Sequence, residues 1–345
     1  MPPERRRVGG PYGGSPHAAT SGLAPRRTLA RLRPCYSDRV KPLSLPPTVA
    51  PAALASLAAI AEHPEDPRVR RFIAFVAAEV DVEAEVDAAP PSPADLAAAT
   101  PPTSREALVQ RMLLAAMLVP PLSTSRLDRL EAHAAALDRA DEPALLDLRR
   151  ALRGEHRRLS ASLLARFPPS DRIRRAWRRG AIGERWRIVK AMLRLPDAAT
   201  AARYRALGDL PESTLGRAFF DPCQRNGFKM PGEPGSLPEP LVFHDMGHAL
   251  VGEGTDVAGE TRMAGFEAGC MGDAGVTMLE FTLLLFNLGA RLPTDARPQV
   301  GAVDVDALLS AFARGRRSSL DVLGWDPMAD ASTPLELLRA RYAID

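Results

Sequence analysis

Hydrophobic residues recur every three or four positions through most of the chain from Pro51 to Leu195. This spacing matches the turn of an α-helix and is clear in PAALASLAAIAEH, REALVQRMLLAAMLV and STSRLDRLEAHAAALDRA. No alternation of polar and hydrophobic residues lasts long enough to predict a β-strand. A proline-rich stretch at 89–104 predicts a break between helices. We therefore expect an all-α fold, a bundle of many helices.

The helical period continues in the C-terminal part of the chain. The segment LPESTLGRAFFDPCQRNGF predicts a helix that ends at Gly227, and residues 237–251 predict a second helix. Ser236 and Glu239 have the spacing of a capping box at the start of this second helix. Because hydrophobic residues cover most of its sides, we expect the 237–251 helix to be buried.

Composition divides the chain into three parts. Residues 1–48 are rich in proline, glycine and arginine and can bury little hydrophobic surface, so we expect a disordered basic tail. Residues 49–195 predict a helical region whose role the sequence leaves open. Residues 196–345 predict a second helical domain, and this domain carries the candidate chemistry.

The three cysteines, Cys35, Cys223 and Cys270, are widely spaced and include no CxxC pair. This pattern argues against a disulfide framework or a thiolate zinc site, and it fits a reducing compartment. No hydrophobic run approaches the roughly 20 residues that a membrane span needs. The first 50 residues lack the continuous hydrophobic stretch of a secretory signal peptide. We therefore expect a cytoplasmic protein.

Residues 171–195 are strongly basic and contain two of the three tryptophans, Trp177 and Trp186. On a helix, Trp186, Val189 and Leu193 share one face. Basic helices that carry tryptophan can lie on anionic membrane surfaces. The alternative is a solvated surface helix whose tryptophans pack on the core. We expect no nucleic-acid binding, because no recognised DNA- or RNA-binding motif accompanies the charge.

The last two of the six histidines, His244 and His248, lie four residues apart in HDMGHALVGEGTDVAGE. A four-residue step brings side chains to the same face of a helix, and Asp245 lies on the same arc. The glycine-containing segment that follows predicts a short turn, which lets Glu260 on the next helix face the histidines. Burying such polar groups without partners is costly. We expect these four residues to bind a metal ion; the alternative is a structural hydrogen-bonded cluster.

Two histidines with carboxylates suit Zn²⁺, which often keeps one position for water or substrate, and they also suit Fe²⁺. An HExxH peptidase is disfavoured, because Asp245 stands where a peptidase has its longer glutamate. Phosphohydrolases of the HD type also have adjacent His and Asp. They need a distant histidine as well, a role that His133 or His156 would fill only by coincidence.

The pattern H-D-x-x-H, then eleven residues, then E resembles the signature of the ubiquinone (coenzyme Q) biosynthesis family. The flanking LPESTLGRAFFDPCQRNGF and the ending GWDPMADASTPLELLRARYAI are also similar to segments of this family. The likeness covers residues 200–345. Two features depart from the family: Ala264 stands where many members have a lysine, and the helical region before residue 195 is not part of the usual family chain.

The resemblance implies a mostly helical fold, a bound divalent metal and a prenylated aromatic quinone precursor as substrate. The implied reaction is an oxidative decarboxylation at ring carbon 1 of a polyprenylated hydroxybenzoate, in which hydroxyl replaces carboxyl, so we expect an enzyme. The resemblance also implies other quinone-biosynthesis enzymes as partners and contact with the inner face of a membrane; a homo-oligomer fits as well. Glu267 stands where the family has a second acidic residue. We expect Glu267 and Asp245 to serve catalysis, with a salt bridge beside the site as the alternative for Glu267.

A second hypothesis is a non-catalytic module of the quinone-biosynthetic complex, which binds a prenyl lipid or acts as a scaffold around a structural metal. Both lipid hypotheses predict an apolar tunnel beside the metal motif. The residues expected to line it are Leu241, Met263, Met271, Leu283 and Phe286. Solid packing around the motif would contradict this expectation.

Overall fold

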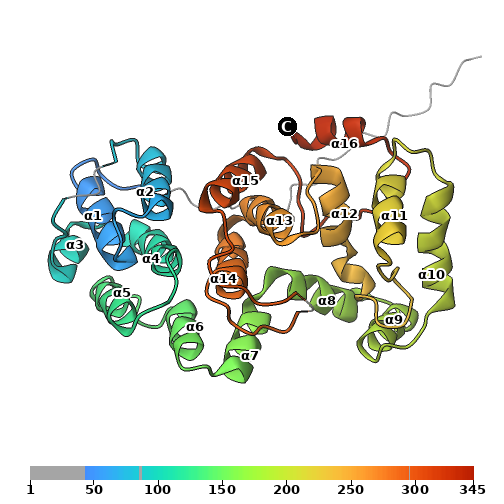
Figure 1. The fold of residues 1–345 in the computed structure, drawn as a ribbon, viewed down its shortest axis with the longest axis horizontal. Coiled ribbons are helices and arrows are strands. Elements are labelled where there is room, and N and C mark those ends of the chain that lie inside the picture. Colours follow the sequence, from blue (N-terminus) through green and yellow to red (C-terminus); the bar gives the residue numbers. More distant parts are fainter. Residues whose placement is uncertain (1–42, 85–87, 295) are drawn as a thin grey trace, which may run out of the picture. The chain divides into compact units, whose positions relative to one another are not determined.

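The computed structural model describes residues 43–345 except 85–87 and 295 (Figure 1). Within this part of the chain the predicted all-α fold is confirmed: there are sixteen α-helices and three 3-10 helices, and no strand beyond two isolated β-bridges. The α-helices are α1 (Ala50–Ala61), α2 (Pro67–Glu79), α3 (Pro93–Ala99), α4 (Pro102–Met117), α5 (Thr124–Ala136), α6 (Pro143–Leu152), α7 (His156–Arg166), α8 (Pro168–Arg179), α9 (Ile182–Met192), α10 (Ala198–Arg205), α11 (Leu215–Asn226), α12 (Val242–Val251), α13 (Val257–Cys270), α14 (Gly275–Phe286), α15 (Val305–Arg317) and α16 (Leu335–Tyr342). The 3-10 helices are η1 (Ala206–Asp209), η2 (Glu239–Leu241) and η3 (Gly272–Ala274).

Proline starts helices in the segment 89–104, where the sequence predicts a break. Pro93 and Pro102 are the first residues of α3 and α4. At this position the missing N–H has no helical partner to lose, and the φ angle of proline already suits a helix. The Ser92 side chain caps α3 by accepting a hydrogen bond from the backbone N–H of Asp95. The predicted break is confirmed in part: residues 89–92 and 100–101 lie outside helices, while the rest of the segment forms α3 and the first turn of α4.

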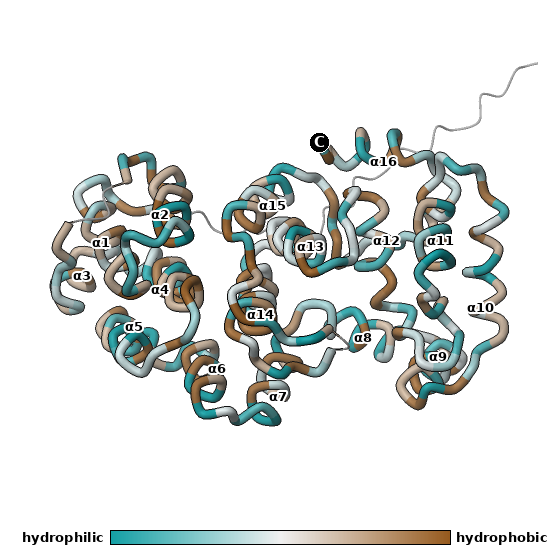
Figure 2. Tube along the Cα trace, viewed as in Figure 1, coloured by the Kyte–Doolittle hydropathy of each residue, from teal (hydrophilic) through white to brown (hydrophobic). Residues whose placement is uncertain are grey.

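Helix α14 lies in the centre of the hydrophobic core. Its residues are mostly hydrophobic (Figure 2), and a helix that is hydrophobic on all sides is stable only when it is buried. Helices α4, α7, α8 and α13 pack against it. Among the described residues, neither α14 nor any other helix is long and apolar enough to cross a membrane.

Helices α13 and α15 approach closely because glycine stands where they meet. A Cβ atom at Gly269 would lie 2.2 Å from the carbonyl oxygen of Phe312, and one at Gly315 would lie 2.0 Å from that of Phe266. Such distances leave no room for any side chain. This contact holds α13, which carries Glu260 and Glu267, firmly against α15.

The regions before and after residue 195 are in direct contact. Helix α2 packs on α15 and α4 packs on α14. The buried side-chain amide of Asn287 donates hydrogen bonds to the backbone carbonyls of Met117 and Leu118. All described residues belong to one compact unit. The division into 49–195 and 196–345 stays a prediction from sequence.

The predicted tail, residues 1–48, lies largely outside the described part of the chain, which begins at residue 43. Of its last six residues, Leu43 and Leu45 are buried in the hydrophobic core. Burial of leucine is favourable because it removes apolar surface from water. The chain therefore joins the packed fold before residue 48.

Candidate metal centre

Helix α12 carries both histidines of the predicted site. Its hydrophobic residues Phe243, Met246 and Leu250 are buried, so the expected burial of this helix is confirmed. It ends at Gly252, whose φ of 85° lies in the left-handed region that glycine adopts without steric penalty. The four-residue spacing places His244 and His248 on the same face.

The start of this segment differs from the prediction. The 3-10 helix η2 leads into α12, and Ser236 does not cap it: the Ser236 hydroxyl accepts a hydrogen bond from the backbone N–H of Gly232. Glu239 instead pairs with the Arg203 guanidinium of α10. The predicted capping box is therefore wrong, because a nearby backbone N–H takes up the Ser236 hydroxyl and a tertiary partner takes up the Glu239 carboxylate.

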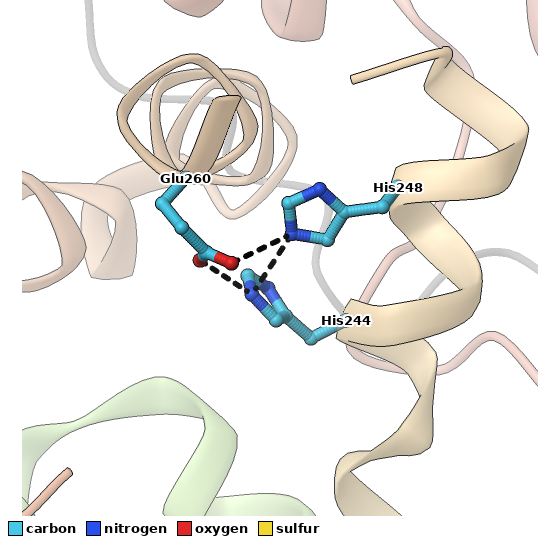
Figure 3. Close-up of side chains that lie close together, drawn as sticks. All are labelled: His244, His248 and Glu260. Atoms are coloured by element: carbon cyan, nitrogen blue, oxygen red, sulfur yellow. Dashed lines mark hydrogen bonds and ion pairs between the residues drawn. The ribbon is translucent and has the colours of Figure 1, made fainter. Parts of the chain in front are cut away.

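The two histidines and Glu260 converge on one point (Figure 3). His244 Nε2 lies 3.2 Å from Glu260 Oε2 and 3.3 Å from His248 Nε2. His248 Nε2 lies 3.5 Å from Glu260 Oε1. The imidazole planes are perpendicular, at 90°, so neither ring blocks the other. The candidate ligand atoms all lie within 4.8 Å of one another.

The second nitrogen of each histidine has a partner outside this group. His244 Nδ1 lies 3.1 Å from Glu267 Oε2, and His248 Nδ1 lies 3.3 Å from the backbone carbonyl oxygen of Glu253. Both partners are acceptors, so both Nδ1 atoms act as donors. A neutral imidazole carries one proton, and a proton on Nδ1 leaves the lone pair of Nε2 free for a metal.

Glu260 reaches this point because a tight turn connects α12 to α13. Asp256 caps α13 by accepting a hydrogen bond from the backbone N–H of Gly259, over 2.8 Å. A Cβ atom at position 259 would lie only 2.0 Å from the carbonyl oxygen of Gly254. Glycine at 259 therefore lets the turn close, and Glu260 then falls in the first turn of α13, facing the histidines.

The electrostatic field at the site favours positive charge on His244. Burial lowers the pKa of His244, but the carboxylates of Glu267 and Glu260 outweigh burial and hold that pKa well above its ordinary value. Burial raises the pKa of Glu260, but hydrogen bonds with His244 and His248 outweigh it and lower that pKa to about 2. A divalent cation between the Nε2 atoms would be stabilised by the same negative charge of Glu260 and Glu267.

The spacing of the ligand atoms fits a metal ion. Two atoms bound to Zn²⁺ at about 2.0–2.1 Å in a tetrahedron lie about 3.3–3.4 Å apart. The two Nε2 atoms lie 3.3 Å apart, and each lies close to one oxygen of Glu260: His244 Nε2 is 3.2 Å from Oε2, and His248 Nε2 is 3.5 Å from Oε1. Two imidazoles and a carboxylate suit Zn²⁺ and Fe²⁺ alike. The group can therefore hold a metal ion, and its donor atoms are compatible with either.

Asp245, which the sequence predicts as a fourth ligand, is not a member of this group. One step along a helix turns the side chain by about 100°. Its carboxyl instead lies near Cys223 of α11, where burial and the charge of Asp245 raise the pKa of the thiol to about 12. Burial also raises the pKa of Asp245 itself, against the opposing effect of His244 and His248. Asp245 thus contributes charge near the histidines and no ligand atom to the group.

Glu267, predicted as a catalytic residue, is completely buried on α13. Its Oε2 contacts His244, and its Oε1 has no hydrogen-bond partner among the described residues. Glu267 does not line the cavity described below. The side chain is therefore placed to orient His244, and its role as a base stays a prediction.

The other two candidate histidines are not part of the site. His133 is buried on α5 with Nδ1 2.8 Å from the carbonyl oxygen of Arg129, and His156 is the first residue of α7. Neither belongs to the group of His244, His248 and Glu260. The histidine that an HD-type phosphohydrolase would add is thus not supplied by either of them.

An apolar cavity of about 590 Å³ lies beside the group, and His244 and Glu260 form part of its wall. Of the five residues expected to line a tunnel, Leu241 and Phe286 do line this cavity. The other three, Met263, Met271 and Leu283, are buried in the hydrophobic core and are not lining residues. Ala264, one helical turn after Glu260, also lines the cavity.

Part of the cavity wall comes from a region that sequence reasoning did not connect with the site. Five residues from the end of α7 and the start of α8 line it: Leu164, Phe167, Pro169, Ser170 and Ile173. The Phe167 ring stacks on Phe281 of α14, with 4.7 Å between centroids and 29° between planes. No local signal marks these residues, because their role depends on how α7 and α8 pack against α14.

Comparison with protein-family models gives no match for this chain, and no curated protein matches it. The resemblance to the ubiquinone biosynthesis family therefore stays a prediction that is based on the sequence motif. The group of His244, His248 and Glu260 is a feature of this structure and does not by itself identify a family.

Proposed function

We propose that this protein is a metal-dependent enzyme that acts on an apolar substrate with an aromatic, acidic head group, of the polyprenylated hydroxybenzoate type. One observation carries the proposal: two histidine Nε2 atoms and a carboxylate converge in the wall of an apolar cavity. Such a cavity suits a hydrocarbon chain, and polar groups at one end of it suit a charged head group.

The exposure of the group favours an enzyme over a module with a structural metal. The side chains of His244 and Glu260 are 28% and 31% exposed, and both border the cavity. Structural zinc sites are closed by four protein ligands, whereas catalytic sites have three and keep one position for water or substrate. Three ligands beside a cavity correspond to the second type.

His244, His248 and Glu260 would hold the ion, for which we propose Zn²⁺ with Fe²⁺ as the alternative. When bound, the ion supplies a Lewis acid that stabilises negative charge on a carboxylate or phenolate oxygen. Glu267 and the carbonyl of Glu253 hold the two imidazoles in place, so that both Nε2 lone pairs point to the same position. The surrounding hydrophobic wall keeps water away from the ring of the substrate.

The proposed reaction replaces the carboxyl group at ring carbon 1 by a hydroxyl group. The bond between the ring and the carboxyl carbon breaks, CO₂ leaves, a new carbon–oxygen bond forms, and the substrate loses two electrons. Dioxygen is the proposed oxidant: it takes up the two electrons with two protons and leaves as hydrogen peroxide, while water supplies the hydroxyl oxygen. Because Zn²⁺ has no redox chemistry, with zinc the electrons would come from the ring directly. The proposal places the protein in the cytoplasm at the inner membrane face, with other quinone-biosynthesis enzymes as partners.

The first test is metal content, measured by elemental analysis of the purified full chain after exposure to Zn²⁺ or Fe²⁺. We expect about one ion per chain in wild type and a loss of most of it in the double variant His244→Ala with His248→Ala, because two of three ligands are gone. The variant His63→Ala, which removes a half-exposed histidine elsewhere, should retain the ion.

The second test is turnover of a prenylated hydroxybenzoate in detergent, with release of CO₂ as the readout. We expect activity that needs both the ion and dioxygen. A wild-type protein that binds no ion under either condition would contradict the proposal. A protein that binds the ion and the substrate without turnover would instead support the lipid-binding module with a structural metal.

A further inference from the structure

Exposed hydrophobic side chains are concentrated on α8, α9 and the residues just after α9. Ile182 is 85% exposed, Met192 70%, Leu193 61% and Trp186 54%. Trp177 and Leu195 are also exposed. The sequence left open whether the tryptophans of this segment pack on the core, and they do not. We call these six residues the α8–α9 face.

On α9 the hydrophobic residues follow the period of the helix. Ile182, Trp186, Val189 and Leu193 fall within an arc of about 60°. Ile188, on another side, is the buried residue of this helix. A surface helix of a globular protein normally turns such a stripe toward the core. Here Ile182, Trp186 and Leu193 of this stripe face solvent, Val189 is half-buried, and no described part of the chain covers Ile182.

Positive charge surrounds this stripe. Residues 171–195 contain nine Lys and Arg residues and two acidic residues, Asp171 and Glu184. Each acidic side chain is paired within its own helix, Asp171 with Arg174 and Glu184 with Arg187. Figure 2 shows hydrophilic and hydrophobic residues interspersed along this segment. Four of its arginines are exposed: Arg178, Arg179, Arg185 and Arg194.

We propose that the α8–α9 face docks this protein on a lipid bilayer with anionic head groups. Tryptophan and aliphatic side chains leave water when they enter the bilayer interface, and arginines bind the lipid phosphates. A second copy of the chain fits less well, because a two-fold contact would bring the same arginines together. A nucleic acid would bind the arginines and leave the hydrophobic stripe in water.

The α8–α9 face lies next to the cavity. Ile173, one helical turn before Trp177, lines the cavity, and so do Leu164 and Leu237, which are exposed. This step rests on the proposed function: a docked protein would take its apolar substrate directly from the bilayer. The docking itself needs neither metal nor substrate.

Binding of the full chain to vesicles of phosphatidylcholine, with and without phosphatidylglycerol, tests the proposal. The test variant is Ile182→Ser with Leu193→Ser. The matched control is Val300→Ser with Leu337→Ser, which also replaces two exposed hydrophobic residues, at 68% and 60% exposure. We expect wild type and control to bind anionic vesicles, less at high salt, and the test variant to bind about tenfold or more weakly. All variants share residues 1–50, so the basic residues there contribute equally.

The tryptophans provide an internal probe of the same contact. Trp177 and Trp186 are exposed, whereas Trp325 is buried and its indole N–H donates a hydrogen bond to Asp330 over 2.9 Å. We expect anionic vesicles to shift tryptophan emission to shorter wavelength in wild type. The double variant Trp177→Phe with Trp186→Phe should lose this shift, because Trp325 is already shielded from water.

Two results would overturn the docking proposal. The first is equal vesicle binding by the test and control variants. The second is the absence of vesicle binding by wild type; a change in the oligomeric state of the test variant would then assign the face to a second copy. The variant His244→Ala with His248→Ala should still bind vesicles, so failure of docking and failure of the proposed enzyme are seen separately.

Discussion

Each histidine of the site has one ring nitrogen inside the metal group and one outside it. The outer contact decides which nitrogen carries the proton and therefore which lone pair is free. For His248 the acceptor is a backbone carbonyl, that of Glu253, which no substitution of the side chain removes. For His244 the acceptor is the buried side chain of Glu267, so this contact can be tested by mutation.

Replacing Glu267 by Gln should weaken metal binding by about 10- to 100-fold, because the neutral amide no longer strengthens His244 as a ligand. Competition with a chromogenic chelator measures this affinity. The control is Glu253→Gln, which changes a side chain paired with Arg262 and Arg314 but leaves the carbonyl acceptor of His248 in place. Equal metal affinity in both variants would mean that the contact with Glu267 does not strengthen His244 as a metal ligand.

At the scale of elements, the turn between α12 and α13 brings the ligands of two helices together. The turn consists of a left-handed residue at Gly252, a cap at Asp256 and a close backbone contact at Gly259. The histidines occupy their face of α12 whatever the turn does. The position of Glu260 depends directly on the turn, because Glu260 immediately follows Gly259, whose backbone contacts that of Gly254.

Substitution of Gly259 by Ala should destabilise the protein by about 1–3 kcal/mol and also lower metal affinity. The added methyl group would overlap the Gly254 carbonyl, which is backbone and has to move, so Glu260 moves with the turn. Urea unfolding and chelator competition measure the two effects. Gly183→Ala on α9 is the control, because no atom lies within 4 Å of the added Cβ atom. Loss of stability without loss of metal affinity would show that the turn does not position Glu260.

At the scale of the whole molecule, a buried charge network joins α6, α7 and α14 and holds the α7–α8 wall of the cavity in place. Arg166 Nη2 lies 2.6 Å from Asp147 Oδ2 and 3.1 Å from Glu280 Oε2. Both carboxylates are almost completely buried. Burial raises the pKa of Glu280 to about 7, although Arg166 acts in the opposite direction.

This raised pKa makes the stability of the protein depend on pH. Between its model value of 4.5 and about 7, Glu280 binds more proton in the folded state than in the unfolded state. The free energy of unfolding should therefore fall as pH rises through this range, by up to about 1.4 kcal/mol per pH unit, with the full penalty present above pH 7. Glu280→Gln should remove this component. Unfolding by urea at several pH values measures it, and the exposed Glu65→Gln is the control. The same slope in wild type and Glu280→Gln would contradict the assignment.

The local sequence was sufficient to predict the all-α fold, the burial of α12 and the meeting of His244, His248 and Glu260. These features follow from the period of a helix and from a short glycine turn, and both act over a few residues. Its charge and its two tryptophans also located the basic segment of α8 and α9. The local sequence could not decide whether these tryptophans point to the core or to solvent.

Only the tertiary structure decided the rest of the site. Asp245 is adjacent to His244 in sequence, yet the packing of α11 on α12 places it near Cys223. Glu267 contacts His244, 23 residues before it in the chain, because α13 packs against α12. Phe167 and Ile173 reach the cavity because α7 and α8 pack on α14, more than a hundred residues away in the chain. Such contacts depend on which helices pack against each other. The spacing of hydrophobic residues predicts which face of a helix is buried, but it does not predict which other helix covers that face.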